Sequence, residues 1–536
     1  MPQVVTERQA GVDVLVVGGG IAATTAALTA AEDGARVALA CTGNLFGGSS
    51  FFSGTWGLGL VGPGEGADEL ADFEQEVLEV GQGMASPELV RTLLAGVEPA
   101  REWLEGLGCE LLRPDDEGQR EYIPCFDRKT RSWTGLSRAS YRATLEPALV
   151  HAGVRICRGF ELLGLSRATD GFTATLFASE NNALVSIPAG SVVLATGGFG
   201  GLFDRTLTDP SVLAAGQALA LGLGASLVNC EFIQIMPGLV SPARDVVFNE
   251  KTFRFARIDG VARGLLAQRA EHGPFTASRP DREVDFAIAR FGADGARVSY
   301  EMPAELPEFM QTYANWLEES YGIGPDDDLR VAHYAHASNG GILIDSRAQV
   351  AGVEGLFVCG ECAGGMHGAD RIGGLASANA LVFGRIAGHE AAARDTAGRG
   401  AVTRVAAGAT FPAACSGLAL PTLAALRRTM GEHCLVARDE QGLLECLGAI
   451  GELRTNLRTA AVARTATTDA AGIAATRRAE LALTSAEAMV AAMLARTESR
   501  GAHFRADHPE QDPAQSRPLV VSQNEEGQLI AAPLTS

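Results

Sequence analysis

The fold of this chain is decided by one stretch, Val12-Asp13-Val14-Leu15-Val16-Val17-Gly18-Gly19-Gly20-Ile21-Ala22-Ala23. The continuous Val/Leu run predicts a parallel strand buried on both faces, and a glycine turn and an alanine-rich helix follow it. Gly18 allows the tight turn, Gly20 lets a diphosphate approach the backbone, and Ala23 is the small residue where helix and strand pack closely. Free N–H groups at the helix N-terminus would bind that diphosphate. The stretch therefore predicts a site for a dinucleotide cofactor.

A second strand is predicted at residues 35–40, after Gly34 ends the first helix. Dinucleotide-binding folds usually place Asp or Glu near the end of this strand, where the carboxylate binds a ribose hydroxyl. Here the strand ends in Ala40-Cys41-Thr42, and the missing acid argues against a simple NAD site. The choice among NAD, NADP and FAD stays open at this point.

The Gly/Ser-rich loop of residues 43–59 comes next. Small residues let backbone N–H groups reach a flat ring, so Gly48, Ser49 and Ser50 are candidates for contact with an isoalloxazine. The alternative is a flexible surface loop that binds nothing.

Two further strand–glycine units follow later in the chain. Their turn residues are Ala195, Thr196 and Gly197 after a strand at 191–194, and Gly360 and Glu361 after a strand at 355–359. A cofactor held from both sides needs more than one such turn, so these residues join the predicted cofactor site. Cys359 and Cys362 form a CxxC pair, but a four-cysteine site would need a second pair. We therefore expect two small residues at a turn and no metal site.

The bulk composition limits partners and location. A net charge of −20 disfavours nucleic acid, because a polyanion would be repelled. No apolar run reaches the ~18 residues that cross a bilayer, and residues 1–11 lack a secretory signal. We expect no membrane insertion, no nucleic acid and a cytoplasmic location.

Taken in order, these segments resemble the flavoprotein family of succinate dehydrogenase, fumarate reductase and L-aspartate oxidase. The most specific match is Gly365-Met366-His367-Gly368-Ala369-Asp370-Arg371-Ile372-Gly373-Gly374, shortly after Gly360-Glu361. Residues 193–198, 231–234 and 498–505 match as well. Residues 35–51 are closest to L-aspartate oxidase, whereas Phe383-Gly384-Arg385-Ile386-Ala387-Gly388 is more similar to soluble fumarate reductases.

The resemblance implies FAD and hydride transfer between flavin N5 and a carbon next to a carboxylate. Members with covalent FAD have a histidine where this chain has Ser50, which implies non-covalent FAD. The expected fold is α/β, with a Rossmann-like FAD-binding domain in two parts (residues 1–240 and 345–400). An α+β capping domain (241–344) is inserted, and a C-terminal helical domain (401–536) ends in a polar tail that frays after Pro509.

The resemblance also implies a catalytic site. Arg282 corresponds to the acid/base arginine, Arg371 to the arginine that pairs with a substrate carboxylate, and Glu250 to a carboxylate that relays protons or holds an ammonium. His336 has the family's spacing to a Gly-Gly pair and is the favoured carboxylate ligand; His333 is the second candidate. The alternatives are a surface or ion-paired arginine, a solvated carboxylate and a core histidine.

Three positions depart from the family pattern. Met236 replaces the histidine that binds the substrate's second carboxylate, Asn249 replaces a threonine, and Asp370 replaces an asparagine. A carboxylate left unpaired in a closed site is costly, so a C4 dicarboxylate should bind poorly.

The predicted function is thus that of an FAD-dependent oxidoreductase acting on a small carboxylate, by C–C or C–N dehydrogenation or by enoate reduction. L-aspartate oxidase is one alternative. A flavoprotein subunit that exchanges electrons with a redox partner protein is another.

Overall fold

A computed structural model describes residues 7–113, 125–324, 326–396, 416–462 and 469–535. The stretch that opened the sequence forms β2 (Val12–Val17) and α1 (Ile21–Glu32), and the chain returns as β3 (Val37–Cys41). Every residue of β3 and all but one of β2 are buried. The predicted strand covered on both faces is therefore present.

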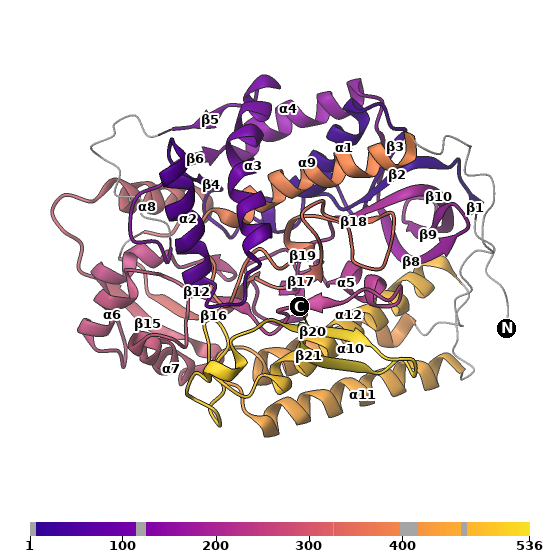
Figure 1. Cartoon of the computed structure of the whole chain (residues 1–536). Coiled ribbons are helices and arrows are strands. Elements are labelled where there is room, and N and C mark those ends of the chain that lie inside the picture. The colour runs from indigo at the N-terminus through magenta and orange to yellow at the C-terminus, as the bar shows by residue number, and fades with distance from the viewer. Residues whose placement is uncertain (1–6, 114–124, 325, 397–415, 463–468, 536) are drawn as a thin grey trace.

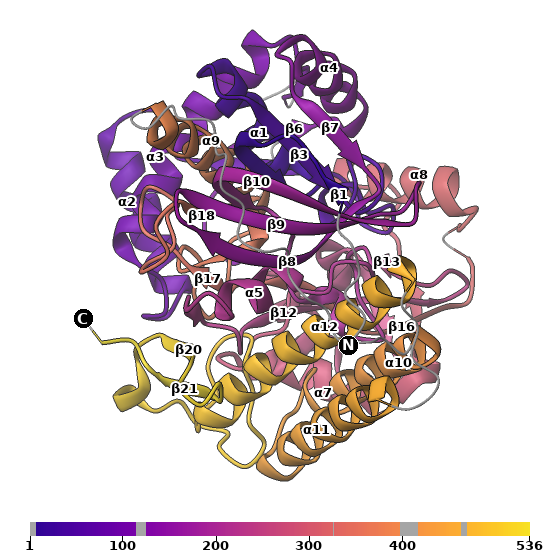
Figure 2. The ribbon, with the colours of Figure 1, turned by 90° about the vertical axis from the view of Figure 1, so that its right-hand side faces the viewer.

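The main sheet is centred on β2 and β10 (Ala183–Leu194). Among the described residues, eight strands form it in the order β7-β3-β2-β10-β9-β8, with β1 and β18 also paired to β10. The remaining bounds are β1 (Glu7–Arg8), β7 (Arg155–Arg158), β8 (Phe160–Ala168), β9 (Gly171–Ala178) and β18 (Leu356–Val358). The first half of β10 pairs antiparallel with β9, and the second half pairs parallel with β2 and β18 (Figure 2). The carboxyl ends of β2, β10 and β18 therefore meet at one edge.

Helix α9 (Leu375–Thr396) packs along α1 (Figure 1). A Cβ added at Gly384 would lie 3.0 Å from the Ala22 carbonyl oxygen, and one added at Gly388 only 2.4 Å from that of Ala26. The two glycines let the helix backbones approach closely. Helix packing thus explains the Gly384–Gly388 motif physically.

Further elements support this frame. They are β4 (Gly59–Gly62), α2 (Ala67–Val80), α3 (Pro87–Gly106), β5 (Leu111–Leu112), β6 (Ser132–Leu136), α4 (Arg138–His151) and α5 (Ala215–Leu221). Helix α3 begins after Ser86, whose hydroxyl accepts a hydrogen bond from the Leu89 amide.

A second sheet lies beside the first, with strand order β13-β12-β16-β15-β14. Its elements are β12 (Ile233–Ser241), β13 (Val246–Val247), β14 (Ala256–Ile258), α6 (Arg263–Arg269), α7 (Glu283–Ala289), β15 (Ala296–Tyr300), α8 (Glu308–Tyr321) and β16 (Leu329–Ser338). Leu239, Phe253 and Val331 belong to a hydrophobic core of its own. Figure 1 shows this unit in pink beside the main sheet. We call it the capping unit.

The C-terminal part contains α10 (Ser416–His433), α11 (Glu440–Val462) and α12 (Ala470–Ala495). The prediction that the tail frays after Pro509 is wrong. Strands β20 (Leu519–Gln523) and β21 (Leu529–Pro533) form a hairpin, and β20 pairs with β11 (Leu227–Val228). The sheet continues through β17 (Gly341–Leu343) to β19 (Ala363–Gly364). The tail is held in place because β20 buries alternate apolar side chains, Leu519 and Val521, as a strand on the edge of a core does.

Within the described ranges, no helix is both long and apolar enough to cross a membrane.

Candidate functional site

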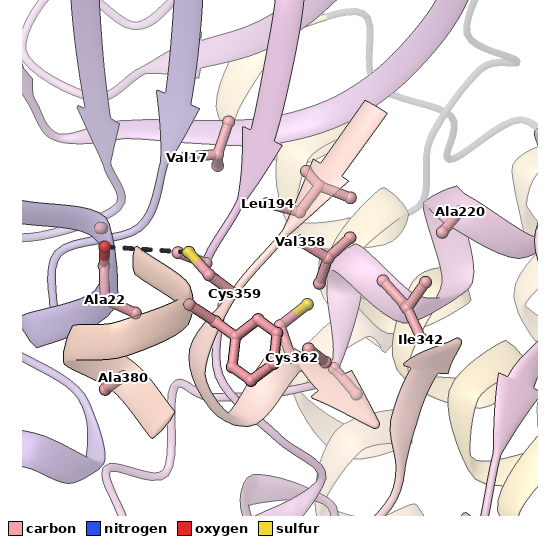
Figure 3. Packing of buried hydrophobic residues seen from close by; sticks show 14 of the residues in the cluster. Val17, Ala22, Leu194, Ala220, Ile342, Val358, Cys359, Cys362 and Ala380 are labelled. Carbon is pink, nitrogen blue, oxygen red and sulfur yellow. Dashed lines mark hydrogen bonds between the residues drawn. The ribbon is translucent and has the colours of Figure 1, made fainter. Parts of the chain in front are cut away.

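The predicted cofactor turns come together where three parallel strands end. The Ala195 amide donates to the Val17 carbonyl (2.9 Å), and the Cys359 amide donates to the Leu194 carbonyl (3.1 Å). Figure 3 shows Val17, Leu194 and Val358 at this junction. Since each strand ends here, the turns that follow all face one region.

Gly18 is required by this close approach. Its φ is +142°, and a Cβ there would lie 2.2 Å from the Ala195 carbonyl oxygen and 3.1 Å from the Ala23 Cβ. The next turn residue, Gly20, is the N-cap of α1 and offers no side-chain cap to the helix amides. A Cβ on Gly20 would lie 3.5 Å from the Ser50 hydroxyl. The helix N-terminus therefore opens toward the Gly48–Ser50 loop and is suited to bind an anion.

Glu361 connects the turns from the other side. Its carboxylate accepts hydrogen bonds from the Ser49 hydroxyl (3.2 Å) and the Ser338 amide (2.9 Å). A Cβ on Gly198 would lie 2.6 Å from Glu361 Oε1. Burial raises the pKa of Glu361. Ser49, at the start of η1 (Ser49–Phe51), and Gly360-Glu361 thus belong to one site.

The turn after β10 is fixed by α5 and by the second cysteine. Gln217 Nε2 donates to the Gly197 carbonyl (2.9 Å), and the Thr196 hydroxyl lies 3.3 Å from Cys362 Sγ. Cys359 Sγ instead lies 3.8 Å from the Ala22 carbonyl oxygen. Figure 3 marks this contact with a dashed line. The CxxC pair is therefore divided between two packing contacts. In the part of the chain that the structure describes, no group of three or more His, Cys, Asp or Glu residues is arranged to hold a metal ion.

One residue of this region was missed by the sequence interpretation. Arg138, at the start of α4, donates from Nε to the Ser50 carbonyl and from Nη1 to the Thr55 carbonyl, both at 3.0 Å. It holds the loop against the helix. No sequence signal distinguishes it, because the contact joins segments that only the tertiary fold brings together.

FAD fits these residues. An uncapped helix N-terminus suits its diphosphate, and the buried carboxylate of Glu361 beside Ser49 suits sugar or ribityl hydroxyls. Gly197 and Gly198 let the turn after β10 approach Val212, Ser338 and Glu361 closely, where an added Cβ would lie 2.3–2.7 Å from those residues.

A second group of polar side chains surrounds Arg371, which is 7% exposed. Its Nη2 donates to Gln234 Oε1, and its Nη1 donates to the Ile372 carbonyl (3.2 Å). Burial and the positive charge of Arg371 lower the pKa of both His336 and His367 to about 3. The two imidazoles are therefore neutral near pH 7 and can donate or accept hydrogen bonds.

His336 is placed by a β-bulge. Ile235 pairs with Ala335 and Gln234 with Ala337, so His336 is the extra residue in β16. Such bulges redirect a side chain. Because Gln234 contacts Arg371, the bulge brings the favoured histidine to the side of the sheet where that arginine lies.

His367 was not among the predicted site residues, although it lies in the quoted motif four residues before Arg371. Both of its ring nitrogens are buried and lack a hydrogen-bond partner in the described structure. His336 Nδ1 is likewise buried and lacks a hydrogen-bond partner in the described structure. Unpaired buried nitrogens are costly, and they indicate a ligand that accepts hydrogen bonds here.

His333, the second histidine candidate, has a different environment. Its Nε2 lies 3.0 Å from Asp285 Oδ1, and Arg269 donates to the same oxygen at 2.9 Å. All three residues are buried inside the capping unit. His333 therefore fits the alternative of a core histidine.

Arg282 ends η5 (Pro280–Arg282) and is half-buried. Its Nη1 donates to the Ala277 carbonyl (2.8 Å), and its guanidinium lies over the Phe504 ring at 5.3 Å. These contacts fix the guanidinium without neutralising it. Glu250 begins η4 (Glu250–Phe255), and its side chain lies outside the described residues.

Met236 follows Gln234 on the same face of β12. It is 5% exposed and clusters with Leu207, Val247 and Tyr334. The face of β12 that contacts Arg371 at Gln234 is therefore apolar at Met236.

Comparisons with known proteins agree with this geometry. Residues 13–376 match the family described as FAD binding domain, and residues 423–530 match the fumarate reductase flavoprotein C-terminal family. The L-aspartate oxidase of Caulobacter vibrioides is 28% identical over 539 residues, covering 95% of each chain. That of Streptomyces coelicolor is 28% identical, covering 95% of this chain and 91% of its own.

Solved structures show the same fold. Sdh1 of Mycobacterium smegmatis in complex with UQ1 has a TM-score of 0.82 at 24% identity, covering 99% of this chain and 94% of that one. The E. coli quinol fumarate reductase has a TM-score of 0.80 at 20% identity, covering 99% and 98%. The family matches, together with the junction of strand ends and glycine turns, show that this chain belongs to the FAD-dependent oxidoreductase family of succinate dehydrogenase, fumarate reductase and L-aspartate oxidase.

Proposed function

We propose that the substrate is a small carboxylate whose far end is uncharged. The single observation that carries this proposal is the contrast along β12. At Gln234, neutral histidines with unpaired nitrogens and Arg371 suit a carboxylate. At Met236 the surroundings are apolar, and a second carboxylate would lose its water without gaining a partner.

Bound FAD supplies hydride transfer at N5. The residues of this chain bind and orient the substrate and move the proton. Arg371 pairs with the substrate carboxylate, and the N–H groups of His336 and His367 donate hydrogen bonds to it. Arg282 gives or takes the proton on the other carbon; Phe504 partly shields the guanidinium from water. Glu250 relays protons or binds an ammonium group.

The test is anaerobic reaction of the flavin with matched substrates, followed by its absorbance. Succinate and L-aspartate are compared with butyrate and 2-aminobutyrate for reduction of the oxidised enzyme, and fumarate with crotonate for oxidation of the reduced enzyme. We expect the monocarboxylates to react faster. Met236→His should reverse the preference, while Met236→Leu should keep it. Faster reaction of the dicarboxylates with the unchanged enzyme would contradict the proposal.

L-aspartate oxidase is the second candidate, and the matches over 95% of the chain favour it. In that case L-aspartate reduces the flavin, oxygen reoxidises it, and Met236→Leu leaves the rate unchanged.

We also propose a redox partner protein, supported by the match of residues 423–530 to the fumarate reductase flavoprotein C-terminal family. Slow reoxidation of the reduced flavin in air, with a co-purifying iron–sulfur protein, would support it. A cytoplasmic location is proposed as well.

We propose that FAD is bound without a covalent bond, because Ser50 replaces the histidine of covalent members. Denaturation in acid should release all of the yellow colour into the supernatant. Colour that stays with the precipitated protein would contradict this prediction.

A further inference from the structure

Asp370 is a buried carboxyl directly before Arg371, at a position where the family pattern has asparagine. It is 4% exposed. Its Oδ2 accepts hydrogen bonds from the Thr276 hydroxyl (2.7 Å) and from Gln82 Nε2 (3.1 Å). One oxygen thus joins the loop of Arg371 to the capping unit and to the turn between α2 and α3.

The same contact reaches the second predicted catalytic arginine. Thr276 is followed by Ala277, whose carbonyl accepts the hydrogen bond from Arg282 Nη1. The Ser278 hydroxyl donates to Gln82 Oε1 (2.9 Å). Asp370 therefore lies between the backbone segments that hold Arg371 and Arg282.

Charged groups face Asp370 from each neighbouring element. A cavity of about 200 Å³ beside it is lined by Glu76 and Glu79 of α2, by Arg128 and by Arg279. Arg269 of α6 also faces it, Arg500 donates to the Gln82 carbonyl, and Arg371 and His367 belong to its own loop. Because Asp370 itself lines this cavity, the carboxyl lies next to a space through which it can exchange protons.

The balance among these groups allows titration near neutral pH. Burial raises the pKa of Asp370 to about 7, although Thr276, Arg279, Arg269 and Gln82 act to lower it. Those four interactions are stronger with the carboxylate than with the neutral acid. By linkage, ionisation of Asp370 must tighten them in turn.

We propose that Asp370 is a titratable positioning residue whose ionisation fastens residues 276–282, and with them Arg282, to the loop of Arg371. The roles of the two arginines rest on the proposed function; the fastening itself does not. Asparagine would keep an acceptor oxygen for Thr276 and Gln82 but could not change charge.

The test uses the FAD-loaded enzyme without substrate. Hydrogen–deuterium exchange of peptides covering residues 276–282 is measured at about pH 6 and about pH 8 and corrected for the intrinsic exchange rate. We expect protection to rise roughly tenfold in the unchanged enzyme and to stay constant in Asp370→Asn. Glu79→Gln, a charge change in the same cavity, should keep the rise; Thr276→Val should remove it.

An equal rise in the enzyme and in Asp370→Asn would overturn the proposal, and so would the absence of any rise in the enzyme. Neither result depends on substrate, so both are distinguishable from failure of the proposed function. Where a carboxylate is found that reduces the flavin, its rate should increase through about pH 7 only in chains that keep Asp370.

Discussion

His336 and His367 show how burial, together with one charged neighbour, sets the protonation state of two side chains. Burial and the charge of Arg371 lower both pKa values to about 3, so both imidazoles are neutral near pH 7 and can donate hydrogen bonds. The positive charge of this group of side chains then comes from Arg371. This division explains how a chain of net charge −20 can still bind an anion locally.

The same shifts predict a pH dependence of stability. The unfolded histidines bind protons below their ordinary pKa of 6.5, whereas the folded rings stay neutral to about pH 3. Stability is therefore present above pH 6.5 and is lost as the pH falls toward 3. Each ring contributes up to about 1.4 kcal/mol per pH unit in this window.

Urea unfolding at about pH 7.5 and about pH 5 measures the effect. His336→Gln combined with His367→Gln should reduce the loss of unfolding free energy by about 2–4 kcal/mol. His389→Gln is the control, because its ring is exposed and lies at the surface beside Asp33. An unchanged loss in the double variant would contradict the prediction.

At the scale of elements, the close packing of α9 against α1 supports the Gly18–Gly20 turn from which α1 begins. Gly388→Val should destabilise the protein by about 1–3 kcal/mol or more, because the added Cβ would lie 2.4 Å from the Ala26 carbonyl. Since α1 begins at the Gly18–Gly20 turn, FAD content should fall as well.

The matched control is Gly448→Ala. Gly448 is exposed on α11, and nothing lies within 4 Å of an added Cβ. It should gain about 0.5–1 kcal/mol from helix propensity. Thermal melting and the ratio of flavin to protein absorbance measure both variants. Equal melting temperatures for the two would show that the helix contact is not tight.

Elements also show what the sequence could predict. The Val/Leu strands and glycine turns at Gly18, Ala195 and Gly360 have local patterns, and the predicted α/β fold with FAD is confirmed. The roles of Arg371, His336 and Arg282 stay proposals. Arg138 could not be found, because its partners are distant in sequence. The hairpin of β20 and β21 was missed because two short strands among polar residues resemble a loose tail until β11 is seen beside them.

At the scale of the whole molecule, a buried ionic network links the C-terminal part to Glu231, two residues before β12. Glu498 accepts from Arg496 Nη1 (2.9 Å) and from Arg500 Nε (2.8 Å) and Nη2 (2.9 Å). Arg496 Nε also donates to Glu231 (2.7 Å). These side chains are all almost fully buried, so each charge depends on the others.

Glu498→Gln should therefore lower the free energy of unfolding by about 3–5 kcal/mol, because it leaves two buried guanidinium groups with one carboxylate. Glu390→Gln breaks a surface pair with Arg347 and should cost less than about 1 kcal/mol. Chemical denaturation compares the two variants. Similar small losses would mean that the network tolerates an unbalanced charge.

The pairing of β11 with β20 has a consequence for biosynthesis. Strand β11 leaves the ribosome well before residues 519–523 are made, yet those residues cover one of its edges. Until then the nascent chain exposes an edge with unpaired N–H and C=O groups, which other strands can join. A product of premature termination before residue 519 keeps that edge permanently, and such fragments are the form of this protein that should aggregate in the cell.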